Sequence, residues 1–390
     1  MLSGKPSFLP ELVMSPDDDF EPTIITAGRP AAEAVPAPDS LGHYLVIVEG
    51  AEPGRRFEFD TTTPITIGRD PQQTLVVADP ELSRRHARVF LVNEEPFVQD
   101  LGSTNGTFID GERLSAPSKL NEGRLLRIGG HYLRYERRSR RDVEREEQLA
   151  RDLRRASAYV SSLLPAPLTT GPVLAEWRFV PSTQLGGDAF GYYWLDPETF
   201  VFYLIDVSGH GVGSAMHSVT VLNVLRQRGL LQVDPTDPSS VLASLNARFQ
   251  MDVHNGLFFT MWYGVYRPRE RSLVCGAAGH HAAYLVPSDK SATHPLGTSN
   301  LMIGAMPEVT YEVHRTTIPA GSAVYVFSDG AFEIETKDGQ RWTMADFLPL
   351  LLQPSRAGTP EAERVYQLVR DAAPPGPLDD DFSLMVISFP

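Results

Sequence analysis

The sequence predicts a multidomain protein in which an all-β sandwich, a helical linker and an α+β domain follow one another. Three observations lead to this fold class. The chain has 390 residues, more than one ordinary hydrophobic core accommodates, so we expect two or three domains. Residues 41–136 form short alternating apolar runs separated by turn residues and contain no helical stretch. Residues 165–390 mix apolar strand-like runs with helical stretches.

The first 40 residues predict a disordered acidic tail. They contain seven prolines, and seven acidic residues stand against only Lys5 and Arg29. A segment with so few apolar residues cannot bury enough surface to offset the entropy lost on folding.

Composition excludes several classes of protein. The formal net charge of −14 argues against general nucleic-acid binding, and with it against a metal-dependent nuclease. The single cysteine, Cys275, allows no internal disulfide and fits a reducing compartment. No apolar run is long enough to span a membrane, and prolines and acids interrupt the N-terminal stretch where a signal peptide would need its apolar core. We therefore expect a cytoplasmic protein without membrane contacts.

The linker, residues 137–164, predicts one helix rich in Arg and Glu. Its apolar residues follow alternating steps of four and three: Leu149, Leu153, Ala156, Val160 and Leu163. About two heptads of this pattern fit either a helix that packs on its own neighbour or a coiled coil that dimerises the chain and carries a signal. The sequence does not decide between them.

The last domain, residues 165–390, predicts antiparallel sheets covered by helices, because its strand-like runs come in adjacent pairs. The expected strands are 199–207, 258–266, 272–280, 323–329 and 382–389. The expected helices are 213–230, 238–252, 343–353 and 359–373.

Four acidic sites lie beside these strands. Asp206 ends the apolar run "FYLID" and Asp329 ends "VYVFSD"; Asp188 follows a glycine pair, and Asp379, Asp380 and Asp381 precede the last strand. If the strand ends converge, the carboxylates repel one another unless cations neutralise them. An all-oxygen set without cysteine selects hard cations, Mg²⁺ or Mn²⁺, and such sites support the hydrolysis of phosphate esters.

The motifs "GGDAFG", "LIDVSGHGVGSAM", "AAGHHAAYLV", "VYVFSDGAFE" and "DDDFSLMVI" resemble the PPM-type (type 2C) metal-dependent serine/threonine phosphatases, and their spacing resembles the bacterial SpoIIE-like branch. The resemblance covers residues 160–390. It implies an α-β-β-α sandwich with two Mn²⁺ or Mg²⁺ ions at one end, and a phosphoserine protein substrate of the sigma-factor regulatory type, an anti-sigma-factor antagonist.

The same resemblance implies a role for each aspartate. Asp206 would bridge both metals, and the backbone carbonyl of Val207 would contact one of them. Asp188 would serve one metal, and Asp329 with Asp380 the other. Asp381 falls where the family has a polar neighbour and is a second-tier metal candidate.

The chain departs from the family pattern at two positions. Many relatives carry a histidine two residues after the bridging aspartate as proposed general acid, where this chain has Ser208, with His210 two residues further on. The general acid is therefore unassigned. Gly191 stands where the branch often carries an aspartate, so no metal contact is expected from that position.

Other residues in this domain have a structural and a functional interpretation. His280 and His281 are expected to be turn histidines satisfied by backbone, with support of the metal site as the alternative. Trp177, Trp194 and Trp262 are expected in the core rather than at a substrate surface. Cys275 is expected to be a buried apolar side chain rather than a reactive thiol.

The N-terminal sandwich carries "TIGRD", "SRRH" and "LGSTNGTFIDG". Phosphothreonine recognition needs a guanidinium, hydroxyl and backbone donors around the phosphate, and a rigid loop. Arg69 can supply the guanidinium. The donors around the phosphate can come from Ser83, Arg84 and Thr104, and Asn105 can bond a peptide backbone.

Together these motifs resemble a forkhead-associated (FHA) domain over residues 43–136. The resemblance implies that the domain binds phosphothreonine peptides without catalysing a reaction. It also makes Gly68 and His86, and with them Gly106 in the tight turn, structural.

Two functions from different classes follow. In the first, the chain is a metal-dependent phosphatase for phosphoserine or phosphothreonine in a bacterial signalling pathway, directed by its FHA domain to a threonine-phosphorylated partner. In the second, the phosphatase fold is inactive and the protein is a phosphorylation-dependent scaffold. Thr23 and Thr26 in the tail, if phosphorylated, could occupy the FHA domain of the same chain or of a dimer partner.

Overall fold

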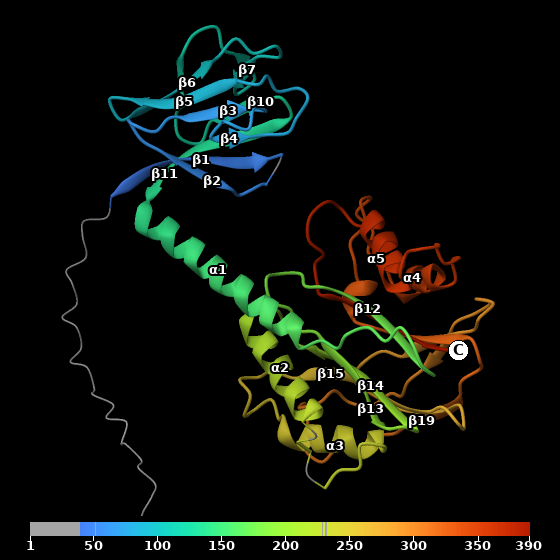
Figure 1. Cartoon of the computed structure of the whole chain (residues 1–390). Coiled ribbons are helices and arrows are strands. Elements are labelled where there is room, and N and C mark those ends of the chain that lie inside the picture. Colours follow the sequence, from blue (N-terminus) through green and yellow to red (C-terminus); the bar gives the residue numbers. More distant parts are fainter. Residues whose placement is uncertain (1–39, 51, 228, 231) are drawn as a thin grey trace, which may run out of the picture. The chain divides into compact units, whose positions relative to one another are not determined.

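The computed structural model describes residues 40–50, 52–227, 229–230 and 232–390. Thr23 and Thr26 lie outside the described residues. The chain divides into two compact units at residues 146 and 147, within helix α1 (Arg140–Ser162) (Figure 1). No helix in these ranges is long and apolar enough to cross a membrane.

The first unit is a sandwich of two sheets. One has the strand order β2-β1-β11-β10-β7-β8 and the other β4-β3-β5-β6-β9. The strands of the first sheet are β1 (Leu41–Glu49), β2 (Arg56–Phe59), β7 (Thr107–Ile109), β8 (Glu112–Arg113), β10 (Leu125–Ile128) and β11 (His131–Ser139). Those of the second are β3 (Ile65–Gly68), β4 (Leu75–Val76), β5 (Ala87–Val92), β6 (Glu95–Asp100) and β9 (Ser118–Lys119).

The alternating sequence pattern explains this core. In β5, Ala87, Val89 and Leu91 are buried while the residues between them are exposed or half-buried. Successive side chains of a strand point to opposite faces, so every second residue reaches the space between the sheets. The all-β fold expected for this region is confirmed.

The second unit contains two five-stranded antiparallel sheets, in the orders β12-β21-β20-β17-β18 and β13-β14-β15-β16-β19. The first sheet consists of β12 (Leu174–Val180), β17 (Ala283–Val286), β18 (His294–Leu296), β20 (Ser322–Phe327) and β21 (Phe382–Phe389). The second consists of β13 (Ala189–Asp196), β14 (Thr199–Val207), β15 (Phe259–Arg267), β16 (Ser272–Ala278) and β19 (His314–Thr317).

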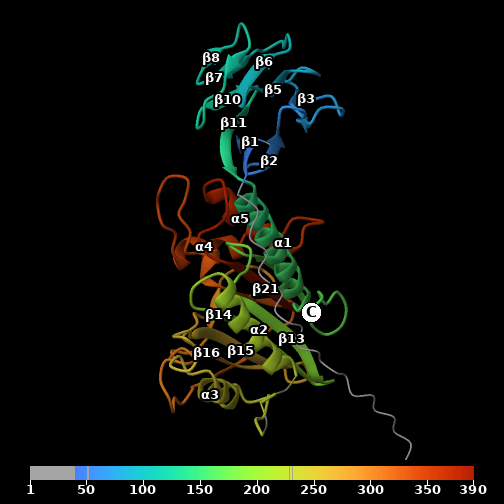
Figure 2. The ribbon, with the colours of Figure 1, turned by 90° about the vertical axis from the view of Figure 1, so that its left-hand side faces the viewer.

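Helices cover both outer faces of this unit, so its layers run α-β-β-α as expected (Figures 1 and 2). Helices α2 (Val212–Arg226) and α3 (Pro238–Arg248) pack on the sheet that contains β14. Helices α4 (Met344–Leu351) and α5 (Glu361–Ala372) pack on the sheet that contains β21. A third cluster, with Phe202, Trp262 and Met385, fills the space between the sheets.

Helix α1 begins at Arg140 rather than at 137, because the residues up to Ser139 continue strand β11. The Ser139 hydroxyl accepts a hydrogen bond from the Asp142 N–H (3.1 Å) and caps the first turn. Val143 is the buried residue of the helix, and Leu149 of the predicted apolar stripe is exposed.

Candidate phosphate-chemistry and phosphopeptide sites

The first pair of aspartates lies at one end of the β13–β14 hairpin. The register of these strands ends at Ala189 opposite Ile205, so Asp188 and Asp206 are the next residues across from each other. Asp188 is buried, and its Oδ2 has no hydrogen-bond partner. A Cβ built on Gly187 would lie 2.8 Å from the Val207 carbonyl oxygen, so the glycine lets the two backbones approach closely.

The second group of aspartates lies where β20 ends and β21 begins. Phe327 pairs with Leu384, which leaves Asp329 and Asp380 just beyond the paired strands. The Ser328 hydroxyl donates to the Asp381 carbonyl oxygen (2.8 Å) and accepts from the Ser383 N–H (3.0 Å). These bonds fix the two strand ends together.

Electrostatics joins the two groups into one acidic cluster. Burial raises the pKa of Asp206 to about 8, and the charges of Asp329 and Asp380 add to the shift. Burial, together with the charge of Asp206, raises the pKa of Asp188 well above its usual value. The structure therefore places the four predicted aspartates near enough to affect one another's ionisation across both sheets.

The same causes act on the other two carboxylates. The pKa of Asp329 is raised to about 6 by burial and then by the charge of Asp380. Asp380 is exposed as a whole residue, yet removal of its carboxylate from solvent is the main cause that raises its pKa. A divalent cation among these groups would favour their ionised forms and so lower these pKa values.

The donor set fits a hard cation. All its side-chain ligands are carboxylates, the Val207 carbonyl lies beside them, and the buried Asp188 Oδ2 lacks a partner. Within the ranges that the structure describes, however, no three His, Cys, Asp or Glu side chains are grouped closely enough to hold a metal ion as they stand.

Asp381 takes a different part in this region. Its Oδ1 accepts hydrogen bonds from the N–H (2.7 Å) and hydroxyl (2.9 Å) of Ser182, and its Oδ2 accepts from the N–H of Gly187 (2.6 Å). Both carboxylate oxygens thus hold the segment that carries Asp188. The sequence analysis did not single out Ser182, which lies outside the quoted motifs, or Ser328, which stands in "VYVFSDGAFE" beside the acid that drew attention.

The loop after Asp206 contains the two residues considered for proton transfer. Ser208 bonds Phe258 through its N–H (3.0 Å to the carbonyl) and through its hydroxyl, which accepts from the Phe258 N–H (3.2 Å). His210 is exposed, and its charge helps to lower the pKa of Asp380 against the larger effect of burial. The imidazole therefore lies near the acidic cluster, whereas Ser208 has a structural role.

The other residues in question are largely buried. His280 Nδ1 and His281 Nδ1 each lie 2.9 Å from a backbone carbonyl oxygen, as expected for turn histidines, and burial lowers the pKa of both. The Nε2 atom of each is buried without a partner. Trp262 is fully buried and Trp177 and Trp194 pack against the same core. Burial also raises the pKa of Cys275 to about 12, which makes it an unreactive thiol.

In the first unit, three loops bring the predicted phosphopeptide residues together. The Arg69 N–H donates to the Ser83 carbonyl (3.2 Å), and the Thr104 N–H donates to the Ser83 hydroxyl (3.1 Å). Arg69, Arg84 and Thr104 are exposed. A Cβ on Gly68 would lie 2.2 Å from the Arg84 carbonyl oxygen, so only glycine allows the first two loops to meet.

Buried groups hold these loops from beneath. His86 is fully buried; its Nδ1 accepts from the Ser83 N–H (3.2 Å), and its Nε2 donates to the Gly106 carbonyl (3.0 Å). The Asn105 side chain donates to the Glu81 carbonyl (2.8 Å) and so joins the same loops.

Asp100, which the sequence analysis missed, accepts bonds from Ser103 and Thr107. Burial acts to raise the pKa of Asp100, but these hydrogen bonds outweigh it and lower the pKa. The carboxylate is thereby kept ionised as an acceptor that orders the loop from 100 to 107.

Comparison with known families identifies both domains. The family profile "Stage II sporulation protein E (SpoIIE)" matches residues 196–390, half of the chain. The chain belongs to the SpoIIE family. The profile "FHA domain" matches residues 65–129, so an FHA domain precedes the SpoIIE domain. The SpoIIE match includes Asp206, Asp329 and Asp380, while Asp188 precedes it.

Individual relatives match either half. "FHA domain-containing protein FhaB" of Mycobacterium tuberculosis is 42% identical over 86 residues, 22% of this chain and 55% of that protein. "Phosphoserine phosphatase RsbU" of Bacillus subtilis is 25% identical over 163 residues, 41% of this chain and 47% of that protein. The chain thus spans about half the length of these curated relatives.

A solved structure shares the fold of the second unit. The "SiaA-PP2C domain of Pseudomonas aeruginosa" superimposes with a TM-score of 0.56 at 18% identity, over 63% of this chain and 98% of that domain. At this identity the likeness shows the fold and not the activity.

Proposed function

We propose that the chain is a metal-dependent protein serine/threonine phosphatase that an FHA domain directs to a threonine-phosphorylated partner. The observation that carries the proposal is the meeting of Asp188, Asp206, Asp329 and Asp380 from two sheets, with a buried carboxylate oxygen that has no protein partner. Family membership and the relation to a phosphoserine phosphatase support the reaction class.

In this proposal two Mn²⁺ or Mg²⁺ ions are held by Asp188, Asp206, Asp329, Asp380 and the Val207 carbonyl. When bound, such ions activate a water molecule and neutralise charge on the phosphoryl oxygens. The protein's own part is to hold the carboxylates in place: Asp381 fixes the Asp188 segment, and Ser328 joins the ends of β20 and β21. Asp381 is then a positioning residue rather than a metal ligand.

The substrate that we propose is a phosphoserine protein, with an anti-sigma-factor antagonist as the class suggested by the family. The FHA domain contributes a separate contact to a phosphothreonine, in which Arg69 and Arg84 bind the phosphate and Asn105 the peptide backbone. A homodimer through residues 137–164 is a further part of the proposal. Leu149 of the apolar stripe is exposed on α1, whereas the other four residues of the stripe are half-buried.

The test is release of phosphate from p-nitrophenyl phosphate and from a phosphoserine protein, with Mn²⁺, Mg²⁺ or a chelator. We expect metal-dependent turnover that Asp206→Asn abolishes. Asp379→Asn is the matched control, because Asp379 adjoins the same acidic run and is exposed. If the wild-type protein releases no phosphate from either substrate with Mn²⁺ or with Mg²⁺, the inactive scaffold becomes the better account.

A further inference from the structure

A pocket of about 200 Å³ lies at the end of the linker helix. Its walls come from the segment after α1, the last turn of α2 and the neighbouring strands β13 and β14. The residues used below are Leu163, Phe190, Tyr192, Tyr193, Tyr203 and Arg226. None of the aspartates described above lines it, and neither does any other acidic residue.

One wall holds a hydroxyl group without a partner. Tyr203 is 0% exposed, and its Oη forms no hydrogen bond. A buried hydroxyl in this state costs free energy that a ligand acceptor can recover. The hydroxyl lies over Gly191 of the pocket wall, where a Cβ would be only 2.4 Å away. The glycine that departs from the family pattern therefore makes room for this hydroxyl.

The opposite side of the pocket supplies a cation. Arg226 Nη1 donates to the Leu163 carbonyl oxygen (2.6 Å), and within the described part of the chain this guanidinium forms no ion pair. A guanidinium has five N–H donors, so several remain for a ligand. Arg226 is near enough to Tyr203 that its charge lowers the pKa of that hydroxyl, against the larger effect of burial.

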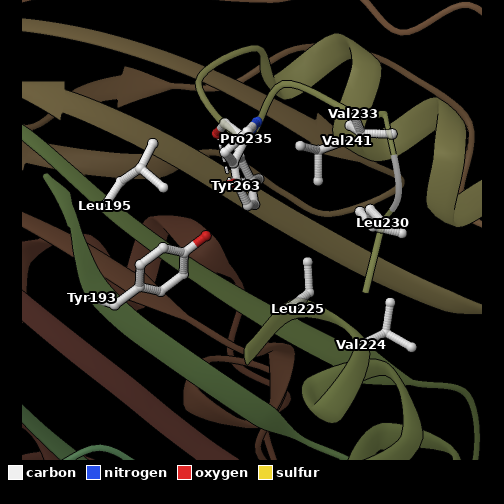
Figure 3. A pocket seen from close by; sticks show the side chains of 9 residues that line it. All are labelled: Tyr193, Leu195, Val224, Leu225, Leu230, Val233, Pro235, Val241 and Tyr263. Carbon is white, nitrogen blue, oxygen red and sulfur yellow. Dashed lines mark hydrogen bonds between the residues drawn. The ribbon is translucent and has the colours of Figure 1, made fainter. Parts of the chain in front are cut away.

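The rest of the lining is largely aromatic and selects the body of the ligand. Phe190, Tyr192 and Tyr193 contribute rings; the Tyr192 hydroxyl already donates to the Ala166 carbonyl (2.8 Å). A neighbouring pocket of about 230 Å³ shares Tyr193 with this one but has apolar walls otherwise, apart from Tyr263 (Figure 3). Of these two pockets, only the one beside Arg226 combines a cation, the unpartnered Tyr203 hydroxyl and apolar walls.

We propose that this pocket binds a small organic acid, whose carboxylate lies between Arg226 and the Tyr203 hydroxyl and whose ring or short chain lies among the aromatic side chains. A cavity of 150 Å³ accepts a benzene ring, so 200 Å³ holds about eight to ten non-hydrogen atoms. An inorganic anion would leave the apolar walls uncovered. The site is a ligand site of its own and does not depend on the phosphatase reaction.

Isothermal titration calorimetry of the full-length protein tests the proposal, with benzoate as the probe. Benzamide has the same shape without the charge, and inorganic phosphate has the charge without the ring. We expect benzoate to bind with a Kd of about 1 mM or tighter, and benzamide and phosphate at least about tenfold more weakly.

Two substitutions locate the binding. Arg226→Gln should abolish saturable benzoate binding, and Tyr203→Phe should weaken it about tenfold. The Tyr203→Phe variant removes no protein hydrogen bond, so its fold is expected to be intact even if Arg226→Gln loosens α1. Arg248→Gln is the control, because Arg248 also ends a helix and donates to a backbone carbonyl, that of Gly229 (3.2 Å).

The outcomes separate clearly. Tight benzoate binding that both pocket variants weaken and Arg248→Gln leaves unchanged supports the site. The absence of saturable binding up to about 20 mM benzoate overturns it. Equal binding by wild type and Tyr203→Phe, or tighter binding of phosphate than of benzoate, also overturns the proposal.

Discussion

The two sites of this chain hold charge in opposite ways. In the FHA domain the charged residues, Arg69 and Arg84, are exposed, and the groups beneath them are hydrogen-bonded to one another through His86 and Asp100. In the SpoIIE domain the charged residues are carboxylates that burial and mutual repulsion keep from ionising freely. The groups of the FHA site are hydrogen-bonded to one another, whereas the carboxylates of the acidic site raise one another's pKa values.

The largest effect expected from this comparison is on turnover. Asp329→Asn and Asp380→Asn should each lower kcat/KM on p-nitrophenyl phosphate by about a hundredfold or more, because each removes a charge that holds cations at the reacting group. Steady-state kinetics at saturating Mn²⁺ measures this. Glu333→Gln is the control, since Glu333 is a nearby acid that pairs with Arg341 at the surface. Full activity in either Asn variant would contradict the assignment.

The FHA site should respond through binding alone. Arg69→Ala should weaken binding of a phosphothreonine peptide about a hundredfold, because it removes a charge-assisted contact to phosphate. The melting temperature should stay the same, since the Arg69 side chain is exposed. Fluorescence anisotropy with a labelled peptide measures the affinity, and Arg124→Ala, at an exposed pair with Asp110, serves as control. An equal loss in both variants would indicate general charge attraction rather than a site.

The two sites should also differ in pH dependence. A carboxyl group whose pKa is raised by folding keeps its proton in the folded state while the unfolded chain has lost it, so stability falls as pH rises between the two values. For Asp206 this window runs from about 4 to about 8, and for Asp329 to about 6.

Thermal unfolding in chelator should therefore occur at lower temperature at pH 8 than at pH 5, and added Mn²⁺ should stabilise more at pH 8. Asp206→Asn should reduce this slope and Asp379→Asn should keep it. A melting temperature that does not change between these pH values in chelator would contradict the raised pKa values of Asp206 and Asp329.

The smallest effect concerns the positioning carboxylate. Asp381→Asn replaces an acceptor oxygen with a donor group, facing the N–H groups of Ser182 and Gly187. We expect a loss of about 1–3 kcal/mol in the unfolding free energy, measured by urea denaturation. Apparent affinity for Mn²⁺ should fall as well, because Asp188 lies on the same segment. Unchanged stability with lost metal binding would instead make Asp381 a ligand.

The sequence predicted the strand ends and the acids at them, because an apolar run that stops at Asp206 or Asp329 is visible locally. Paired apolar runs also predicted antiparallel sheets covered by helices, while the order of the layers was implied by the family resemblance. The sequence could not predict the part played by Asp381, whose partners Ser182 and Gly187 lie almost 200 residues earlier. These contacts depend on the pairing of β21 with the end of β12, and a local sequence pattern does not predict pairing between strands so far apart in the chain.

The FHA domain shows the same division. Arg69 and Asn105 stand in short motifs and were found, while Asp100 sits in an ordinary strand and was not. The pocket beside Arg226 was also not predicted from the sequence, although Gly191 in its wall was noted as a departure from the family pattern. Its two polar groups, Tyr203 and Arg226, come from a strand and a helix that the sequence gives no reason to combine.

Counting bound Mn²⁺ tests the central claim that four aspartates from two sheets form one cation centre. Calorimetric titration of the metal-free protein should give two ions per chain for wild type and for Asp379→Asn. Asp206→Asn, which removes the carboxylate proposed to contact both ions, should lose at least one of them and bind the other far more weakly. Two ions bound with unchanged affinity by Asp206→Asn would contradict the account.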